Sequence, residues 1–284
     1  MIRTIAVIGT GTMGRGIAYL SAVAGYDTIL HDAETSALEA AQASIESTLR
    51  KGVEKGKLTE DALIEATGRL HLATDIEAAA RGADLIIEAV PESLELKVDL
   101  FAEVDLFCSE ETILASNTSS ISITRLAAGV ERRDRFAGLH FFNPPHVMKL
   151  IEIVRGEQTS DETVTEVREV AVRMGKTAIV VQDSPGFATS RLGVALGLEA
   201  IRLLEQGIAS AEDIDRAMEL GYNHPMGPLR LTDLVGLDVR LGIAEYLAST
   251  LGPRFEPPQL LRDLVAEGKL GKKTGQGFYR GDRD

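Results

Sequence analysis

A short glycine-rich turn constrains the fold of this chain more than any other feature. Residues 9–14 read Gly-Thr-Gly-Thr-Met-Gly, follow the strand-length apolar run 4–8, and open a helical pattern that ends at Gly25. In a G-x-G-x-x-G turn the first glycine permits the tight bend, the second lets a ligand approach the backbone, and the third lets helix and strand pack closely. The helix N-terminus then offers unpaired N–H groups to phosphates. The residues predicted to form this cradle are Gly9, Thr10, Gly11, Thr12, Met13 and Gly14.

The first half of the chain alternates apolar runs of strand length with helical patterns. Further strands are predicted at 27–31, 85–87 and 112–115, and helices at 38–49 and 97–107. Strands that are apolar throughout, alternating with helices, indicate a parallel sheet with helices on both faces. The fold class predicted is therefore α/β, with a Rossmann-like N-terminal domain.

The pattern changes in the second half of the chain. Strand-like runs at 136–142 and 147–154 flank the Asn-Pro-Pro sequence at 143–145, and one more strand is predicted at 178–182. Beyond a break at 183–186 only helical patterns remain. They cover residues 187–206, 211–220, 228–251 and 259–267, and Ser210 with Asp213 forms a capping-box pattern at the start of the second. We expect a Rossmann-like domain at residues 1–183 and an all-helical domain at 184–284.

Charge and composition exclude several classes of function. Asp and Glu outnumber Lys and Arg by 43 to 30, so the net charge is −13, which disfavours binding to nucleic acid or to an anionic membrane. The single cysteine, Cys108, allows no intrachain disulfide and no thiolate metal cluster. No apolar run reaches the roughly 18 residues of a membrane span, and the N-terminus does not resemble a signal peptide. We expect a cytoplasmic protein without a metal site, a nucleic-acid partner or a membrane anchor.

The acid at the end of the second predicted strand indicates which cofactor the turn binds. Asp32 lies where a carboxylate can accept hydrogen bonds from the ribose hydroxyls of a dinucleotide. The same carboxylate would repel the 2′-phosphate of NADP. The sequence therefore predicts an NAD site.

The rest of the chain resembles the short-chain L-3-hydroxyacyl-CoA dehydrogenases, including the bacterial 3-hydroxybutyryl-CoA dehydrogenases. The resemblance implies an NAD-dependent oxidoreductase of fatty-acid metabolism that interconverts (S)-3-hydroxyacyl-CoA and 3-ketoacyl-CoA. It also implies a homodimer formed through the helical domain. The segments that carry it are 9–18 (GTGTMGRGIA), 88–97 (EAVPESLELK), 115–120 (ASNTSS), 136–152 (FAGLHFFNPPHVMKLIE), 183–187 (DSPGF), 226–238 (MGPLRLTDLVGLD) and 271–279 (GKKTGQGFY).

Oxidising a secondary alcohol requires a hydride acceptor and a base for the hydroxyl proton. Among the five histidines, His140 ends a predicted strand and precedes a turn, where catalytic groups of an open α/β sheet collect. If 136–142 and 147–154 pair as a hairpin, Glu152 can face His140 and orient its imidazole. The residues alone leave a structural strand histidine as an equal alternative. The resemblance implies that His140 is the catalytic acid–base and Glu152 its partner.

Other positions are assigned only by the resemblance. It implies that Ser119 and Asn143 contact both the substrate oxygen and the nicotinamide end of the cofactor, and that Glu92 and Lys97 lie near the cofactor. It places Lys273 in the cofactor site and Thr48 and Lys55 against CoA. Spacing alone also permits ordinary turn residues and solvated lysines at these positions.

Position 190 departs from the family pattern. Where relatives carry asparagine among the polar residues of the substrate site, this chain has Ser190. A serine is shorter and offers one hydroxyl in place of an amide. We expect activity to survive this change, with an altered preference among acyl groups.

Two alternatives to the leading function remain at this stage. One is a related dehydrogenase of a non-CoA hydroxy acid or sugar acid, of the gulonate type. The other is a non-catalytic protein that keeps the fold, as lens lambda-crystallin does. The joint presence of Ser119, His140, Asn143 and Glu152 disfavours the second alternative. We expect no hydratase activity, because a chain of this length lacks room for the hydratase domain of multifunctional fatty-acid oxidation enzymes.

Overall fold

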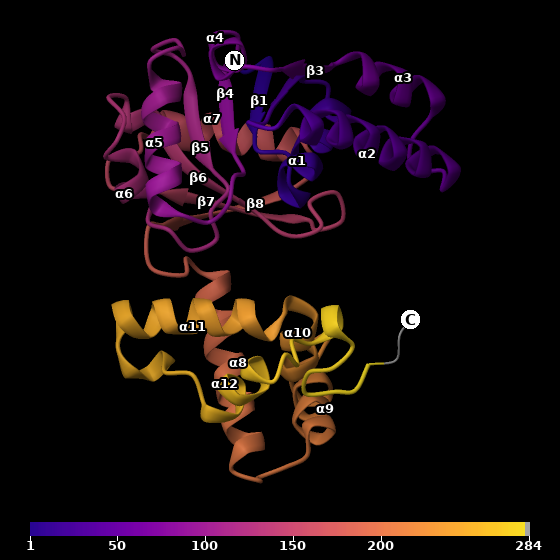
Figure 1. The fold of residues 1–284 in the computed structure, drawn as a ribbon, viewed down its shortest axis with the longest axis vertical. Coiled ribbons are helices and arrows are strands. Elements are labelled where there is room, and N and C mark those ends of the chain that lie inside the picture. Colours follow the sequence, from indigo (N-terminus) through magenta and orange to yellow (C-terminus); the bar gives the residue numbers. More distant parts are fainter. Residues whose placement is uncertain (282–284) are drawn as a thin grey trace. The chain divides into compact units, whose positions relative to one another are not determined.

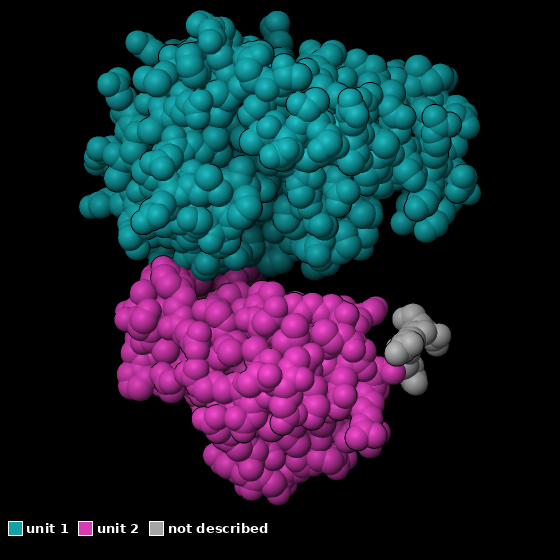
Figure 2. All heavy atoms as spheres, viewed as in Figure 1, with its two compact units in different colours: residues 1–184 teal, residues 185–284 magenta. Residues whose placement is uncertain are grey.

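The computed structural model describes residues 1–281. The chain divides into two compact units, Met1–Ser184 and Pro185–Asp284 (Figure 2). The first unit contains a sheet with flanking helices, and the second is built from helices (Figure 1). Within residues 1–281, no helix is both long enough and apolar enough to cross a membrane.

The first unit is organised around one eight-stranded sheet of order β3-β2-β1-β4-β5-β6-β7-β8. Strands β1 to β6 pair in parallel, β6 and β7 pair antiparallel, and β7 and β8 pair in parallel. The strands are β1 (Thr4–Ile8), β2 (Asp27–His31), β3 (Leu70–Ala73), β4 (Leu85–Glu88), β5 (Ile113–Ser116), β6 (Phe136–Phe141), β7 (Leu150–Arg155) and β8 (Thr177–Gln182). Because β1 lies between β2 and β4, the strand order reverses there, and ligands of such sheets bind beyond the carboxyl ends of the strands at that point.

The expectation of a parallel sheet covered by helices is confirmed. Helices α1, α2 and α7 share one apolar core with the sheet, in which Ile17, Ile45 and Val167 pack with Val7 and Leu139. The helices of this unit are α1 (Thr12–Val23), α2 (Thr35–Glu54), α3 (Glu60–Gly68), α4 (Ile76–Arg81), α5 (Leu94–Asp105), α6 (Ile123–Ala127) and α7 (Asp161–Arg173).

Side-chain caps explain where most of these helices begin. The caps of α3, α4, α5, α6 and α7 each accept a hydrogen bond from a backbone N–H of the first turn, and they are Thr59, Asp75, Ser93, Ser122 and Ser160. Helix α1 differs, because Gly11 at its N-cap provides no side-chain bond. The first N–H groups of α1 therefore have no side-chain acceptor at the cap and are suited to a ligand.

One strand was not predicted. No strand was predicted between residues 31 and 85, but the structure places His71 on β3, which pairs in parallel with β2. Strand β3 is an edge strand whose residues 71 and 72 are exposed. An edge strand exposed in this way lacks the continuous apolar run that marked the central strands.

Between residues 185 and 281, the second unit contains five α-helices and has its own apolar core. Val194, Leu198 and Ile201 of the first helix pack with Leu237 and Leu247. The helices are α8 (Thr189–Glu205), α9 (Ala211–Tyr222), α10 (Pro228–Val235), α11 (Leu237–Leu251) and α12 (Gln259–Ala266). Between residues 185 and 281 the only β pairing consists of two isolated bridges, so a helical domain is confirmed.

The prediction of one continuous helical segment over residues 228–251 is wrong. The segment divides into α10 and α11 at Gly236, whose φ of +106° is incompatible with a continuous α-helix. The predicted cap at Ser210 is confirmed, since its hydroxyl oxygen accepts a hydrogen bond from Asp213 N.

Candidate active site

The glycine turn between β1 and α1 has the shape that a bound pyrophosphate requires. Gly9 has a φ of +97°, and a Cβ there would lie 2.7 Å from the carbonyl oxygen of Ala89. A Cβ on Gly14 would lie 1.8 Å from the carbonyl oxygen of Gly9, so the third glycine is required for close packing. A Cβ on Gly11 would meet no atom within 4 Å. The turn is therefore tight on its protein side and open where a ligand approaches.

Asp32 follows β2 and is tied to this turn. Its carboxylate accepts hydrogen bonds from Thr10 N at 2.8 Å and from Thr10 Oγ1 at 2.7 Å. Partial burial works to raise the pKa of Asp32, but the hydrogen bonds from Thr10 and Glu34 and the charge of His31 outweigh it and lower that pKa. Asp32 is therefore a carboxylate anion at neutral pH.

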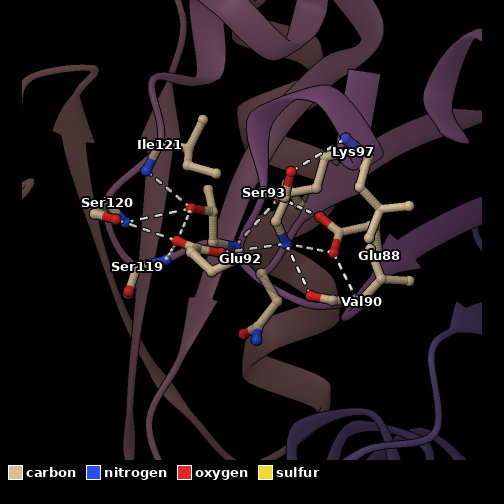
Figure 3. A network of polar contacts seen from close by, with 12 residues as sticks. Glu88, Val90, Glu92, Ser93, Lys97, Ser119, Ser120 and Ile121 are labelled. Atoms are coloured by element: carbon tan, nitrogen blue, oxygen red, sulfur yellow. Dashed lines mark hydrogen bonds and ion pairs between the residues drawn. The ribbon is translucent and has the colours of Figure 1, made fainter. Parts of the chain in front are cut away.

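A buried ion pair lies behind the loop that follows β4 (Figure 3). Lys97 Nζ lies 2.5 Å from Glu88 Oε1, and Ser116 Oγ donates to Glu88 Oε2 at 2.6 Å. Lys97 is 1% exposed and Glu88 is 0% exposed. Burial raises the pKa of Glu88 above its ordinary value, against the opposing effects of Lys97 and Ser116. This pair joins the ends of β4 and β5 to the start of α5.

Glu92 connects that pair to the loop after β5 (Figure 3). Its Oε2 lies 3.3 Å from Lys97 Nζ. Its Oε1 accepts from Thr118 Oγ1 at 2.5 Å, from Ser119 N at 3.2 Å and from Ser120 Oγ at 3.2 Å. Of the residues assigned by the resemblance, the structure thus brings Glu92, Lys97 and Ser119 into one network.

His140 and Glu152 face one another across β6 and β7, in register as directly opposed residues. His140 Nδ1 lies 2.8 Å from Glu152 Oε2. Glu152 is 0% exposed and His140 is 6% exposed. Because a carboxylate only accepts hydrogen bonds, this contact assigns the Nδ1 proton to the imidazole and leaves the exchangeable position at Nε2.

A small cavity of about 140 Å³ lies between α1, α2 and the turn after β6. Asn143 and Thr48 both line it, so the structure brings together a residue assigned to the reacting end and one assigned to CoA. Lys55 lies one residue beyond α2 and is exposed.

Two of the residues singled out from the sequence belong to the second unit. Ser190 is the second residue of α8. Lys273 lies in the 3₁₀ turn Lys272–Thr274, and its Nζ pairs with Asp238 Oδ1 at 2.5 Å. The main chain of this C-terminal segment is held by Asp233, which accepts from Phe278 N at 2.9 Å and Tyr279 N at 3.0 Å.

Sequence reasoning did not single out Glu88, Ser116 or Asn117. Asn117 Oδ1 accepts from Phe141 N at 3.0 Å and so ties the loop after β5 to β6. The sequence did contain a signal for Glu88, which ends an otherwise apolar strand at the carboxyl edge of the sheet. Burying a carboxylate there costs free energy unless it has a partner. Within residues 1–281, no group of three or more His, Cys, Asp or Glu side chains could hold a metal ion.

Two family models cover almost the whole chain. The model of the 3-hydroxyacyl-CoA dehydrogenase NAD binding domain matches residues 4–184, and that of the 3-hydroxyacyl-CoA dehydrogenase C-terminal domain matches residues 186–281. The chain belongs to the 3-hydroxyacyl-CoA dehydrogenase family. Its first unit carries the NAD-binding domain of that family.

Individual family members agree with this assignment. A probable 3-hydroxybutyryl-CoA dehydrogenase of Deinococcus radiodurans is 46% identical over 275 residues, which are 96% of this chain and 98% of the relative. The corresponding Bacillus subtilis protein is 45% identical over 98% of this chain and 97% of its own. The crystal structure of (S)-3-hydroxybutyryl-CoA dehydrogenase from Ralstonia eutropha superposes with a TM-score of 0.95 at 43% identity, covering 99% of this chain and 100% of that one.

Proposed function

We propose that this member of the 3-hydroxyacyl-CoA dehydrogenase family interconverts (S)-3-hydroxyacyl-CoA, such as 3-hydroxybutyryl-CoA, and 3-ketoacyl-CoA with NAD. The observation that carries the proposal is the His140–Glu152 contact of 2.8 Å beside the carboxyl ends of the central strands. The tight turn at Gly9, the open space at Gly11 and the anionic Asp32 fit NAD. When bound, NAD supplies the acceptor for the hydride that leaves the alcohol carbon.

The acid–base work falls to His140. During oxidation its Nε2 takes the hydroxyl proton, and during reduction it returns that proton to the oxygen. Glu152 holds the ring by its Nδ1 and stabilises the imidazolium that forms. We assign Ser119 and Asn143 to the substrate oxygen and the nicotinamide end, as short hydrogen-bonding groups that do not titrate beside the base.

The remaining family positions act around these groups. Glu92 accepts from Ser119 N at 3.2 Å, and Lys97, being buried, contributes to the cofactor site through Glu92 and the loop it holds. We assign Thr48, Lys55, Ser119 and Ser190 to acyl-CoA. We assign Lys273 to the cofactor.

Following NADH absorbance with a panel of 3-ketoacyl thioesters tests the proposal. We expect turnover of acetoacetyl-CoA and none of free acetoacetate. A diketoreductase with dual catalysis of dicarbonyl compounds has a structure that is similar to this one, at 33% identity and a TM-score of 0.87, so free dicarbonyls belong in the panel. Turnover of free acids or diketones without turnover of any CoA thioester would transfer the assignment to a non-CoA dehydrogenase.

Cofactor preference is a separate expectation that rests on Asp32. A carboxylate facing the 2′-phosphate of NADP in a partly desolvated site should make kcat/KM for NADH roughly tenfold to a thousandfold higher than for NADPH. Asp32→Ala should narrow this ratio, whereas Asp27→Ala, at the exposed start of β2, should preserve it. Equal kcat/KM values for the two cofactors in the unmodified protein would contradict the role of Asp32.

We further propose a homodimer formed through the second unit, in the cytoplasm. Large apolar side chains are exposed together on α10 and the start of α11, and they are Leu231, Leu234, Val235 and Val239. The single cysteine is in keeping with a reducing compartment.

The mass in solution checks the dimer. We expect twice the chain mass of 30.5 kDa, and we expect Leu234→Glu combined with Val239→Glu to give the single-chain mass without unfolding, because both side chains are exposed. Ile64→Glu, at a still more exposed position on α3 of the first unit, should stay dimeric. A double variant that keeps the mass of the unmodified protein would place the interface elsewhere.

A further inference from the structure

The cavity between α1 and α2 contains a cation that the proposed mechanism does not use. Arg15, on the first turns of α1, lines this cavity of about 140 Å³ together with Tyr19, Thr48 and His146. No residue that lines the cavity is acidic, whereas hydroxyl groups come from Thr12, Ser44 and Thr48. Hydroxyls and a guanidinium without a carboxylate form a donor set that suits an anion.

The charge of Arg15 is not neutralised by its neighbours. No Asp or Glu in residues 1–281 lies within 4.0 Å of its guanidinium, and no hydrogen bond of that side chain is formed within the same residues. Five of the other eleven arginines of the first unit are paired with a nearby carboxylate, and they are Arg69, Arg81, Arg132, Arg135 and Arg155. What distinguishes Arg15 is that its unpaired charge lines a cavity, where a ligand can meet it.

Neighbouring cations give the cavity a positive local potential. Partial burial, then the charges of Lys176 and Lys57, lower the pKa of His146, so its ring is uncharged at neutral pH. That ring meets Tyr19 edge-on, with the two centroids 5.8 Å apart. An anion entering here would meet attraction from Arg15 and hydrogen bonds from the hydroxyl groups.

The wall of the cavity is formed before any ligand arrives. A Cβ on Gly16 would lie 2.6 Å from Pro145 Cγ, so the turn after β6 packs directly on α1. Lys176 Nζ donates to the carbonyl oxygens of Pro145 at 2.6 Å and Met148 at 2.7 Å, which anchors the turn from the other side. A preformed wall lowers the cost of ordering on binding.

We propose that Arg15 binds a phosphate group of acyl-CoA in this cavity. The inference rests on the proposed function and adds to it a residue and a ligand group. The cavity is smaller than the roughly 300–1,000 Å³ that encloses a drug-sized ligand, so it takes one part of a larger molecule. CoA is a polyanion that the net charge of this chain repels. The unpaired guanidinium of Arg15, in the cavity that Asn143 and Thr48 also line, offsets that repulsion locally.

A pair of substrates that share the acetoacetyl thioester, one with the phosphates of CoA and one without them, tests this. Acetoacetyl-CoA carries them, and the N-acetylcysteamine thioester of acetoacetate does not. With Arg15→Ala, we expect kcat/KM for acetoacetyl-CoA to fall about tenfold or more, with kcat/KM for the small thioester and KM for NADH unchanged. Arg15→Lys should recover part of the loss, since it keeps the charge without the bidentate fork. Arg168→Ala, at an exposed position on α7, removes the same charge and should change kcat/KM for neither substrate.

Three results would overturn the proposal. An equal loss with both thioesters would show that Arg15 does not act through phosphate. A rise in KM for NADH alone would assign the phosphate to the dinucleotide, and unchanged kinetics would remove Arg15 from any site.

Calorimetric titration of the unmodified protein and of Arg15→Ala with CoA and with pantetheine separates this proposal from the proposed function. Binding of CoA that weakens on Arg15→Ala supports Arg15 even if no thioester is turned over.

Discussion

Replacing His140 with glutamine should lower kcat by about 10²–10⁴-fold while NADH binding persists. Glutamine keeps a hydrogen-bonding side chain of similar size but cannot exchange a proton, so it removes general acid–base catalysis, which typically contributes a factor of this size. The measurement is steady-state reduction of acetoacetyl-CoA, paired with a fluorescence titration of NADH binding. His71→Gln on the exposed strand β3 is the matched control and should retain full activity.

Glu152→Gln extends the same test to the carboxylate that contacts His140. An amide can still accept from His140 Nδ1, but it does not carry the charge that stabilises imidazolium, so kcat should fall here as well. Because Glu152 is fully buried, its variant needs a check of the folded state by circular dichroism. Near-normal turnover by His140→Gln would show that another residue carries the proton.

The central part of the fold was predictable because its strands are apolar and short. β1 and β2 were predicted with their observed bounds, since a parallel strand buried on both faces shows no polar alternation. The pairing of β6 with β7 followed from the turn between two apolar runs. Edge strand β3 was missed for the opposite reason, because His71 and Leu72 are exposed and interrupt the apolar pattern.

The contacts around the candidate site were harder to predict than its elements. The hairpin register that opposes His140 and Glu152 follows from the strand period of two once the pairing is assumed. The link from Lys97 through Glu92 to Ser119 joins two loops and a helix, and no period in the sequence specifies it. The environment of Arg15 was equally hard to predict, because α1, α2 and the turn after β6 form it together.

The buried pair of Glu88 and Lys97 leads to the second large expected effect. Lys97→Met removes the cation and leaves Glu88, 0% exposed, in an apolar surrounding with Ser116 and the N–H of Val90 as its remaining donors. Breaking a buried pair from one side costs about 3–5 kcal/mol of unfolding free energy. Urea denaturation of the unmodified protein and the variant measures this loss. Arg81→Met, which breaks the exposed pair with Glu77, is the control and should cost about 0–1 kcal/mol.

Two further measurements separate loss of the pair from loss of packing. Adding Glu88→Gln to Lys97→Met removes the uncompensated charge and should recover part of the stability, although each change alone is destabilising.

The loss of unfolding free energy in Lys97→Met should also shrink as pH falls. Burial already raises the pKa of Glu88 above its unfolded value, and removing Lys97 raises it further, so the folded state holds the proton more tightly than the unfolded state. The stability contributed by that proton is present at pH values below the unfolded pKa and is lost as pH rises through the folded pKa. A variant whose deficit is the same from acid to neutral pH, or no larger than that of Arg81→Met, would show that the contact between Lys97 and Glu88 does not hold this loop in place.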